Sequence, residues 1–423
     1  MTTLDPLLRP FRGRFALLIA VAMTAATTLA HAAAPPGLAV PDAPYRAPYV
    51  PTNDDAILQQ VPAASDPAVH KMAILRAELN ISPGSLRTAE QLAFAYLGFG
   101  RRLGDAHYAG YAEAVIAPWM ARASPPVPAL VLQATILQVR HEFDPARKLL
   151  EQVLAHDPRN MQAWLTLATI ETVQGDYANA ARACAEIGRT RGLAVNAACV
   201  ANLREYQGQA RQGIALLKQI DVDAPGASSA SGAWVQGLLA ESFERLGDWT
   251  SAETHYRKAL TFAPDDNFLL VAYADFLLDR NRPREVLTLL ADHTQSDTAF
   301  LRLALAQAAL KSPEASRYTW IMAARFEALK QRGSYYFGRE QARFALQLQH
   351  DPQAALTLAE QNWQVQHEPW DARVLLEAAQ AAHRPQAAAP VLAFLQQSRL
   401  EDPIIEPLAR QLRARLDAKT VAR

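Results

Sequence analysis

The chain has 423 residues, of which half are hydrophobic and only 18 are glycine. This composition excludes a disordered or collagen-like protein and is typical of a helical protein with a continuous apolar interior. Basic and acidic residues number 42 each and the pI is about 7.2, so net charge gives no attraction to nucleic acid or to an anionic membrane. We therefore expect no nucleic-acid partner.

The N-terminus resembles a secretory signal peptide. Three arginines precede an apolar run over residues 15–30, and the small-residue sequence AHAAA follows at residues 30–34. Residues 1–32 are predicted to be removed, although cleavage after Ala34 fits the Ala-x-Ala pattern equally well. Because the run is short for a bilayer span of ~20 residues, we expect a periplasmic protein with no stable membrane insertion after cleavage. Retention as an N-terminal membrane anchor is the alternative.

Residues 33–62 contain seven prolines, a density that prevents regular helix. This segment is predicted to be an extended linker, or an arm that packs along the folded part. Residues 63–126 show helical periodicity and include a degenerate helix pair over 87–122, with its turn at Gly104-Asp105.

Helix pairs repeat clearly over 127–296. In the unit over 234–264, Ala240 and Ala252 are the small residues at which two helices cross, Gly247 with Asp248 makes the turn, and Pro264 ends the second helix. This pattern resembles the tetratricopeptide repeat (TPR), with a period of 34 residues between Ala146 and Ala180. The resemblance, together with the signal peptide, suggests a TPR protein of the exported bacterial type. It implies an all-α fold, a superhelical solenoid of antiparallel helix pairs.

Residues 297–423 are predicted to form further degenerate pairs and a C-terminal capping helix. The second helix of the first of these pairs, from about Pro313, is expected to be longer than the others. The cap is expected over 400–416, with Arg410, Arg413 and Arg415 toward water and Leu412 toward the core.

No set of side chains in the sequence has the spacing of a catalytic or metal site. The ten histidines are dispersed, without a His-Glu-x-x-His or Cys-x-x-Cys pattern, and neither a Walker-type loop nor a Gly-x-Ser-x-Gly elbow occurs. The glycines near Gly100 are interpreted as close packing between helices. We therefore predict a protein that is not an enzyme and holds no cofactor or metal.

The two cysteines, Cys184 and Cys199, fall in consecutive helices that lie side by side in a TPR stack. An oxidising compartment would allow them to form a disulfide worth about 3 kcal/mol. Two buried free thiols in small core positions fit the sequence equally well, and both alternatives stay open.

The TPR resemblance implies that the first helix of each pair lines a concave, partner-binding surface. Apolar or small residues stand where a carboxylate clamp would need lysine, so binding of a C-terminal carboxylate is not expected. The later units look acidic, which favours a basic or polar extended segment of a partner protein. The alternative is ordinary solvated helix faces with Trp234 in the packing. The predicted concave-face residues are Gln138, Gln162, Thr169, Thr172, Asn202, Glu205, Trp234, Glu241, Glu244 and Asp275.

The preferred function is a non-catalytic periplasmic scaffold for protein–protein interaction or assembly of an envelope complex. A specific version is an adaptor in polysaccharide secretion or outer-membrane assembly. The rival is an enzyme or small-ligand-binding protein with a pocket among the C-terminal helix pairs. That rival depends on aromatic residues at Trp320, Tyr335, Tyr336, Trp363 and Trp370.

Overall fold

The structure is a computed structural model that describes residues 66–190, 192–224, 228–331 and 338–421. The predicted signal peptide and proline-rich segment lie outside these ranges. All regular structure within them is helical. The helices are α2 (Pro67–Ile81), α3 (Leu86–Leu103), α4 (His107–Met120), α5 (Val127–Val139), α6 (Phe143–His156), α7 (Met161–Val173), α8 (Tyr177–Arg189), α9 (Leu193–Tyr206), α10 (Ala210–Leu217), α11 (Ser229–Arg245), α12 (Trp249–Phe262), α13 (Asn267–Asp279), α14 (Pro283–Leu289), α15 (Asp297–Ala309), α16 (Ala315–Gln331), α17 (Gly338–Gln347), α18 (Pro352–Trp363), α19 (Pro369–Ala381), the 3₁₀ helix η2 (Pro385–Ala388), α20 (Ala389–Ser398) and α21 (Ile405–Val421).

The helices form consecutive hairpins, α3 with α4, α5 with α6, and so on through α17 with α18. From α3 to α11 and again from α13 to α21, each odd-numbered helix also contacts the next odd-numbered helix. These helices form an inner layer and the even-numbered helices an outer one. This is the all-α, TPR-like solenoid that the sequence predicts.

Short polar turns end the first helix of each hairpin and begin the second. Gly247 adopts a left-handed φ of 71°, and the Asp248 side chain then caps α12 by accepting from the Ser251 amide. Gly175 with φ 77° and Asp176 do the same before α8. Non-glycine residues take the same left-handed turn position in other hairpins, both among the clear repeats and among the C-terminal ones. They are His141, Asn281, Lys311, His350 and His383.

Small residues lie where helices cross most closely, as predicted. Ala240 and Ala252 are fully buried between α11 and α12. A Cβ on Gly100 would come within 2.7 Å of the Asp105 carbonyl oxygen and of Tyr108 Cβ, so this glycine permits close approach of α3 and α4. At the C-terminus, α21 begins at Ile405, later than expected, with Leu412 buried.

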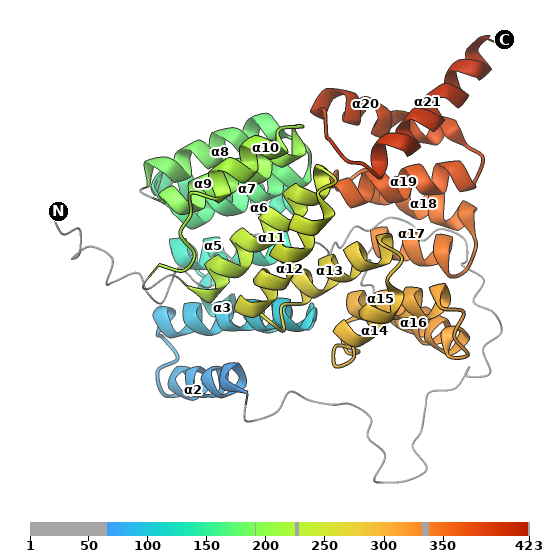
Figure 1. The fold of residues 1–423 in the computed structure, drawn as a ribbon. Coiled ribbons are helices and arrows are strands. Elements are labelled where there is room, and N and C mark those ends of the chain that lie inside the picture. Colours follow the sequence, from blue (N-terminus) through green and yellow to red (C-terminus); the bar gives the residue numbers. More distant parts are fainter. Residues whose placement is uncertain (1–65, 191, 225–227, 332–337, 422–423) are drawn as a thin grey trace, which may run out of the picture.

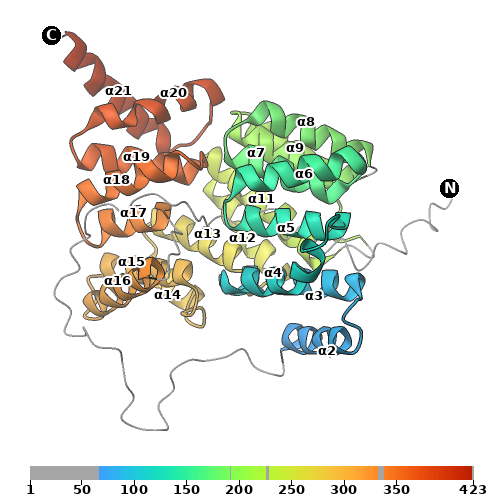
Figure 2. The same cartoon turned by 180° about the vertical axis from the view of Figure 1, so that it is seen from behind.

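The solenoid turns far enough for distant repeats to meet. Helix α13 contacts α3, and the Arg101 guanidinium lies 3.0 Å from the Asp266 carboxylate. The His367 amide, before α19, donates to the Val173 carbonyl at the end of α7 at 2.7 Å. Figures 1 and 2 show the resulting shape: an N-terminal lobe (α2–α10) and a C-terminal lobe (α14–α21) lie on either side of α11–α13. The concave side therefore lies between the two lobes.

Candidate binding cavity

A cavity of about 200 Å³ occupies the concave side. Its walls come from both lobes and from the helices between them, including α3, α11, α13, α15, α17 and α19. Eight carboxyl groups and five guanidinium groups line the cavity, so acidic side chains outnumber basic ones in its walls. The carboxylates are those of Asp105, Glu241, Glu244, Asp275, Asp279, Glu340, Glu368 and Asp402, and the arginines are Arg101, Arg245, Arg302, Arg339 and Arg373.

Four of the ten predicted concave-face residues lie at or directly beneath this cavity. Glu241, Glu244 and Asp275 line it. Glu205 is completely buried on α9, where it accepts a hydrogen bond from Ser242 Oγ at 3.0 Å. The structure therefore brings together carboxylates from α9, α11 and α13.

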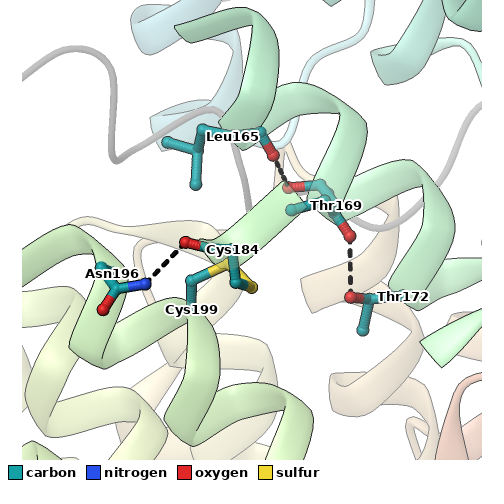
Figure 3. Close-up of a disulfide and its surroundings, with 7 residues drawn as sticks. Leu165, Thr169, Thr172, Cys184, Asn196 and Cys199 are labelled. Atoms are coloured by element: carbon teal, nitrogen blue, oxygen red, sulfur yellow. Dashed lines mark hydrogen bonds between the residues drawn. A yellow bond between two sulfur atoms is a disulfide. The ribbon is translucent and has the colours of Figure 1, made fainter. Parts of the chain in front are cut away.

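The other six predicted concave-face residues do not line the central cavity. The hydroxyls of Thr169 and Thr172 donate to carbonyls one turn earlier on α7 (Figure 3). The Gln162 amide donates to Thr166, also on α7. These hydroxyl and amide N–H groups bond within their own helix, whereas Gln162 Oε1 accepts no hydrogen bond from any residue that the structure describes. None of the six is among the residues that line the cavity; they are Gln138, Gln162, Thr169, Thr172, Asn202 and Trp234.

Trp234 is 7% exposed and packs in the core between α9 and α11, as the alternative interpretation proposed. Its ring also borders a second, smaller pocket that includes Arg101, Asp266 and Phe268. The Trp234 side chain therefore does not stand exposed on the concave face.

One group of charged residues in the cavity wall is neutralised within the protein. The Arg302 guanidinium contacts both oxygens of Asp275, the closest at 2.7 Å, and also lies 2.5 Å from Glu340. Arg343 adds a second guanidinium 2.6 Å from Asp275. Burial by itself would raise the pKa of Asp275, but Arg302 and Arg343 outweigh it and lower that pKa to about 2. We call Asp275, Arg302, Glu340 and Arg343 the paired cluster.

A second group has more carboxylates than cations. Glu205, Glu241 and Glu244 all face a single guanidinium, that of Arg245. Arg245 lies 3.4 Å from Glu205 and makes its shortest contact, 2.5 Å, with Asp402 from the C-terminal lobe. We call Glu205, Glu241 and Glu244 the glutamate cluster.

The glutamate cluster holds its protons more tightly than ordinary glutamates. Burial raises the pKa of Glu244 to about 8 and that of Glu205 to about 7, against the opposing effect of Arg245. Burial and the nearby Glu205 raise the pKa of Glu241 well above its usual value. Glu244 accepts a hydrogen bond from the Tyr256 hydroxyl, whereas Glu241 has no hydrogen bond or ion pair with any residue that the structure describes.

The structure joins Cys184 and Cys199 in a disulfide between α8 and α9 (Figure 3). The two Cα atoms lie 5.7 Å apart, and both side chains are buried. Asn196 on α9 donates to the Cys184 carbonyl at 2.6 Å, which adds a second link between the same helices.

The aromatic residues of the rival pocket do not gather in one place. Trp320 on α16 is 43% exposed, Trp363 packs edge-on against Phe394, and Trp370 lines the central cavity between Arg343 and Arg373. Tyr335 and Tyr336 lie outside the described residues. Across the described ranges, no cluster of three or more His, Cys, Asp or Glu side chains has metal-binding geometry, and no helix is both long and apolar enough to span a bilayer.

Sequence reasoning found three of the eight carboxylates that line the cavity and none of its five arginines. Arg245 directly follows Glu244, and the spacing from Asp275 to Arg302 places both on neighbouring inner helices, so these two could have been found from the repeat register. Asp402 reaches the site only because the lobes meet, and no local pattern marks it.

The model of the tetratricopeptide repeat family matches residues 131–192. No curated protein matches the sequence. Among solved structures, the chain is similar to one described as the APC/C hetero-tetramer Cut9–Hcn1, with 13% identity, a TM-score of 0.46, and coverage of 82% of this chain and 69% of that one. A human IFIT1 dimer with m7Gppp-AAAA is 12% identical, with a TM-score of 0.44 and coverage of 78% of this chain and 86% of that one. Yeast Tom70 is 11% identical, with a TM-score of 0.40 and coverage of 84% of this chain and 86% of that one.

None of these three likenesses bears on what this chain binds. The repeated helix hairpins, their inner and outer layers and the match over 131–192 agree with one another. The chain contains tetratricopeptide repeats, within an all-α, TPR-like solenoid of helix hairpins.

Proposed function

We propose that this TPR protein is an exported, non-catalytic scaffold that holds a partner protein of the cell envelope by a basic or polar extended segment. TPR proteins bind protein or peptide partners, and the concave cavity is where the inner helices of this chain converge. The observation that carries the proposal is the excess of carboxylates over guanidinium groups in its walls.

Export is supported by the N-terminal sequence and by the disulfide. The order of charged, apolar and small residues over 1–32 is that of a secretory signal, and disulfides persist mainly in oxidising compartments. A periplasmic location fits both. Within the envelope, a role as an adaptor in polysaccharide secretion or outer-membrane assembly is the more specific version.

The location is tested by expressing the chain with and without residues 1–32 and separating periplasmic from cytoplasmic fractions. The proposal expects the full chain in the periplasmic fraction, with the N-terminus shortened after Ala32 or Ala34, and the truncated chain in the cytoplasm. Full-length chain that stays in the cytoplasm would refute the location. Uncleaved chain in the membrane fraction would establish the N-terminal anchor instead.

The binding surface is tested by charge reversal, using an affinity-tagged chain and cross-linked envelope fractions. The Glu241→Lys/Glu244→Lys double variant should lose the captured partner. The matched control is Glu151→Lys/Glu406→Lys, which makes the same change of net charge at exposed positions on α6 and α21 outside the cavity. Equal capture by both double variants and by the original chain would refute the proposal that the acidic cavity holds the partner.

A further inference from the structure

We propose that the cavity contains a site for a cationic nitrogen group, an alkylammonium or a guanidinium, bound between Glu241 and Glu244 on α11. This inference rests on the proposed function and names the chemical group that its partner would insert. The two glutamates are three residues apart, which places them on one face of the helix, and both line the cavity.

In the paired cluster, the buried carboxylate of Asp275 is fully neutralised by ion pairs within the protein. Asp275 receives two guanidinium groups, at 2.6 and 2.7 Å. Each arginine that lines the cavity is already within ion-pair distance of another carboxylate: Arg101 of Asp266, Arg245 of Asp402, Arg302 of Asp275, Arg339 of Glu368 and Arg373 of Asp279. Glu241 and Glu244 form none of these pairs, so a cation from outside would complete the cluster.

A separate residue in the same cavity also calls for a hydrogen-bond donor. Asn267, at the start of α13, is 9% exposed and lines the cavity. Its Nδ2 donates to Thr298 at 3.0 Å, but its Oδ1 accepts no hydrogen bond from any residue that the structure describes. A buried acceptor without a donor is costly, and an N–H group from a ligand would remove that cost.

The rest of the wall suits the stem that carries such a group. Phe268, Tyr256, Val271 and Trp370 line the cavity, and its volume of about 200 Å³ leaves room for a short alkyl chain. Lysine and arginine bury their apolar stems against such surfaces while the charged end meets polar groups. The ligand chemistry therefore fits either a basic side chain of a partner protein or a free amine.

Cation binding should be coupled to proton release. Burial raises the pKa of both glutamates, that of Glu244 to about 8, so a bound cation that favours their ionised forms displaces protons. Other charged and titratable groups face these two glutamates from α9, α11, α12, α13 and the segments before α19 and α21. They are Glu205, Tyr206, Arg245, Tyr256, Asp279, Glu368 and Asp402. Since the ammonium of a lysine stays charged to about pH 10, affinity should rise between pH 6 and pH 8.

The test is isothermal titration calorimetry of the purified protein with three probes. N-acetyl-lysine amide represents a partner's side chain, 1,5-diaminopentane represents a free amine, and N-acetyl-norleucine amide is the uncharged control. We expect saturable binding of a charged probe and none of the norleucine probe. Tighter binding of the lysine probe would assign the site to a partner's side chain, and tighter binding of the diamine to a small molecule.

The Glu241→Gln/Glu244→Gln variant should lower the affinity for the charged probe by about ten-fold or more, because each lost ion pair in a partly buried site is worth at least that factor. Glu151→Gln/Glu406→Gln should leave it unchanged. Titration of the original protein in buffers of different ionisation enthalpy gives an independent readout, because the apparent heat should reveal protons released on binding.

Three results would overturn the inference: absence of saturable binding by both charged probes, equal binding of the norleucine probe, or binding without proton release. The proposed function fails differently. A chain whose capture of its partner depends on Glu241 and Glu244, but which binds neither charged probe, would keep its acidic binding surface and lose only the cation site.

Discussion

The paired cluster and the glutamate cluster lie in the wall of the same cavity, yet they handle buried charge in opposite ways. In the paired cluster, two arginines keep Asp275 ionised and lower its pKa to about 2. In the glutamate cluster, three carboxylates share Arg245, and burial raises the pKa of Glu244 to about 8. Acidic residues on the concave face of a TPR solenoid are therefore of two kinds: some hold the repeats together, and others remain able to take a cation.

The largest effect should come from making the paired cluster resemble the glutamate cluster. Arg302→Met removes the guanidinium shared by Asp275 and Glu340 and leaves both carboxylates buried without it. Breaking a buried pair in this way costs about 3–5 kcal/mol. Urea unfolding followed by circular dichroism measures the loss. Arg284→Met, at an exposed position on α14, should change stability by no more than about 0.5 kcal/mol, and a similarly small loss for Arg302→Met would remove the distinction between the clusters.

Loss of the disulfide is expected to have the next largest effect on stability. The disulfide fixes the position of α9, which carries both Cys199 and Glu205 of the glutamate cluster. Cys184→Ala/Cys199→Ala should lower the free energy of unfolding by about 3 kcal/mol, the value expected for a closed loop of this length. The same loss should follow when reductant is added to the original protein, and reductant should not affect the double variant. Alkylation without reduction, followed by mass spectrometry, checks the bond itself, since two labelled thiols would show that it is absent.

Contact between the lobes is expected to contribute less to the free energy of unfolding than the disulfide does. This contact also brings Asp402 to the glutamate cluster. Gly208 has a left-handed φ of 67°, and a Cβ there would lie 2.1 Å from the Arg399 carbonyl oxygen in the C-terminal lobe. Gly208→Ala should therefore cost about 1–2 kcal/mol from the backbone alone and should separate the lobes. Small-angle scattering would then report a larger radius of gyration. Gly84→Ala, which meets nothing within 4 Å, is the matched control, and an unchanged radius for both would contradict the importance of this contact.

The helix hairpins could be predicted from the sequence because each hairpin depends on local signals. Gly247 with Asp248 marks a turn, and Ala240 and Ala252 mark a close crossing, wherever the hairpin lies in the chain. The meeting of His367 with Val173 depends on a small rotation at every repeat between them, and such rotations accumulate without leaving a motif.

The same reasoning separates the parts of the cavity that could be predicted from those that could not. Glu241 and Glu244 were found because their spacing places them on the inner face of α11. Whether a given carboxylate is neutralised depends on arginines from other repeats, as with Asp275 and Arg343, and on residues such as Asp402 that arrive only through lobe contact. An acidic face can thus be predicted from one helix, but its binding capacity cannot.

The sharpest contrast between the two clusters is in how the stability of the protein depends on pH. Asp275 has a lowered pKa, so its contribution to stability is present above about pH 4 and is lost as the pH falls toward 2. Glu244 and Glu205 have raised pKa values, so the folded state binds more protons than the unfolded state between about pH 4.5 and pH 8. Their contribution is present below that interval and is lost as the pH rises through it.

Thermal unfolding at pH 5, 6, 7 and 8 should therefore show a fall in stability that Glu244→Gln reduces, with a difference of about 3 kcal/mol between pH 5 and pH 8. Glu151→Gln, at an exposed position on α6, should leave the slope unchanged. A bound cation should flatten the slope in the original protein, because it stabilises the ionised glutamates that otherwise become costly at high pH. A slope that Glu244→Gln leaves intact would mean that the glutamate cluster ionises freely, and the two clusters would then differ in geometry alone.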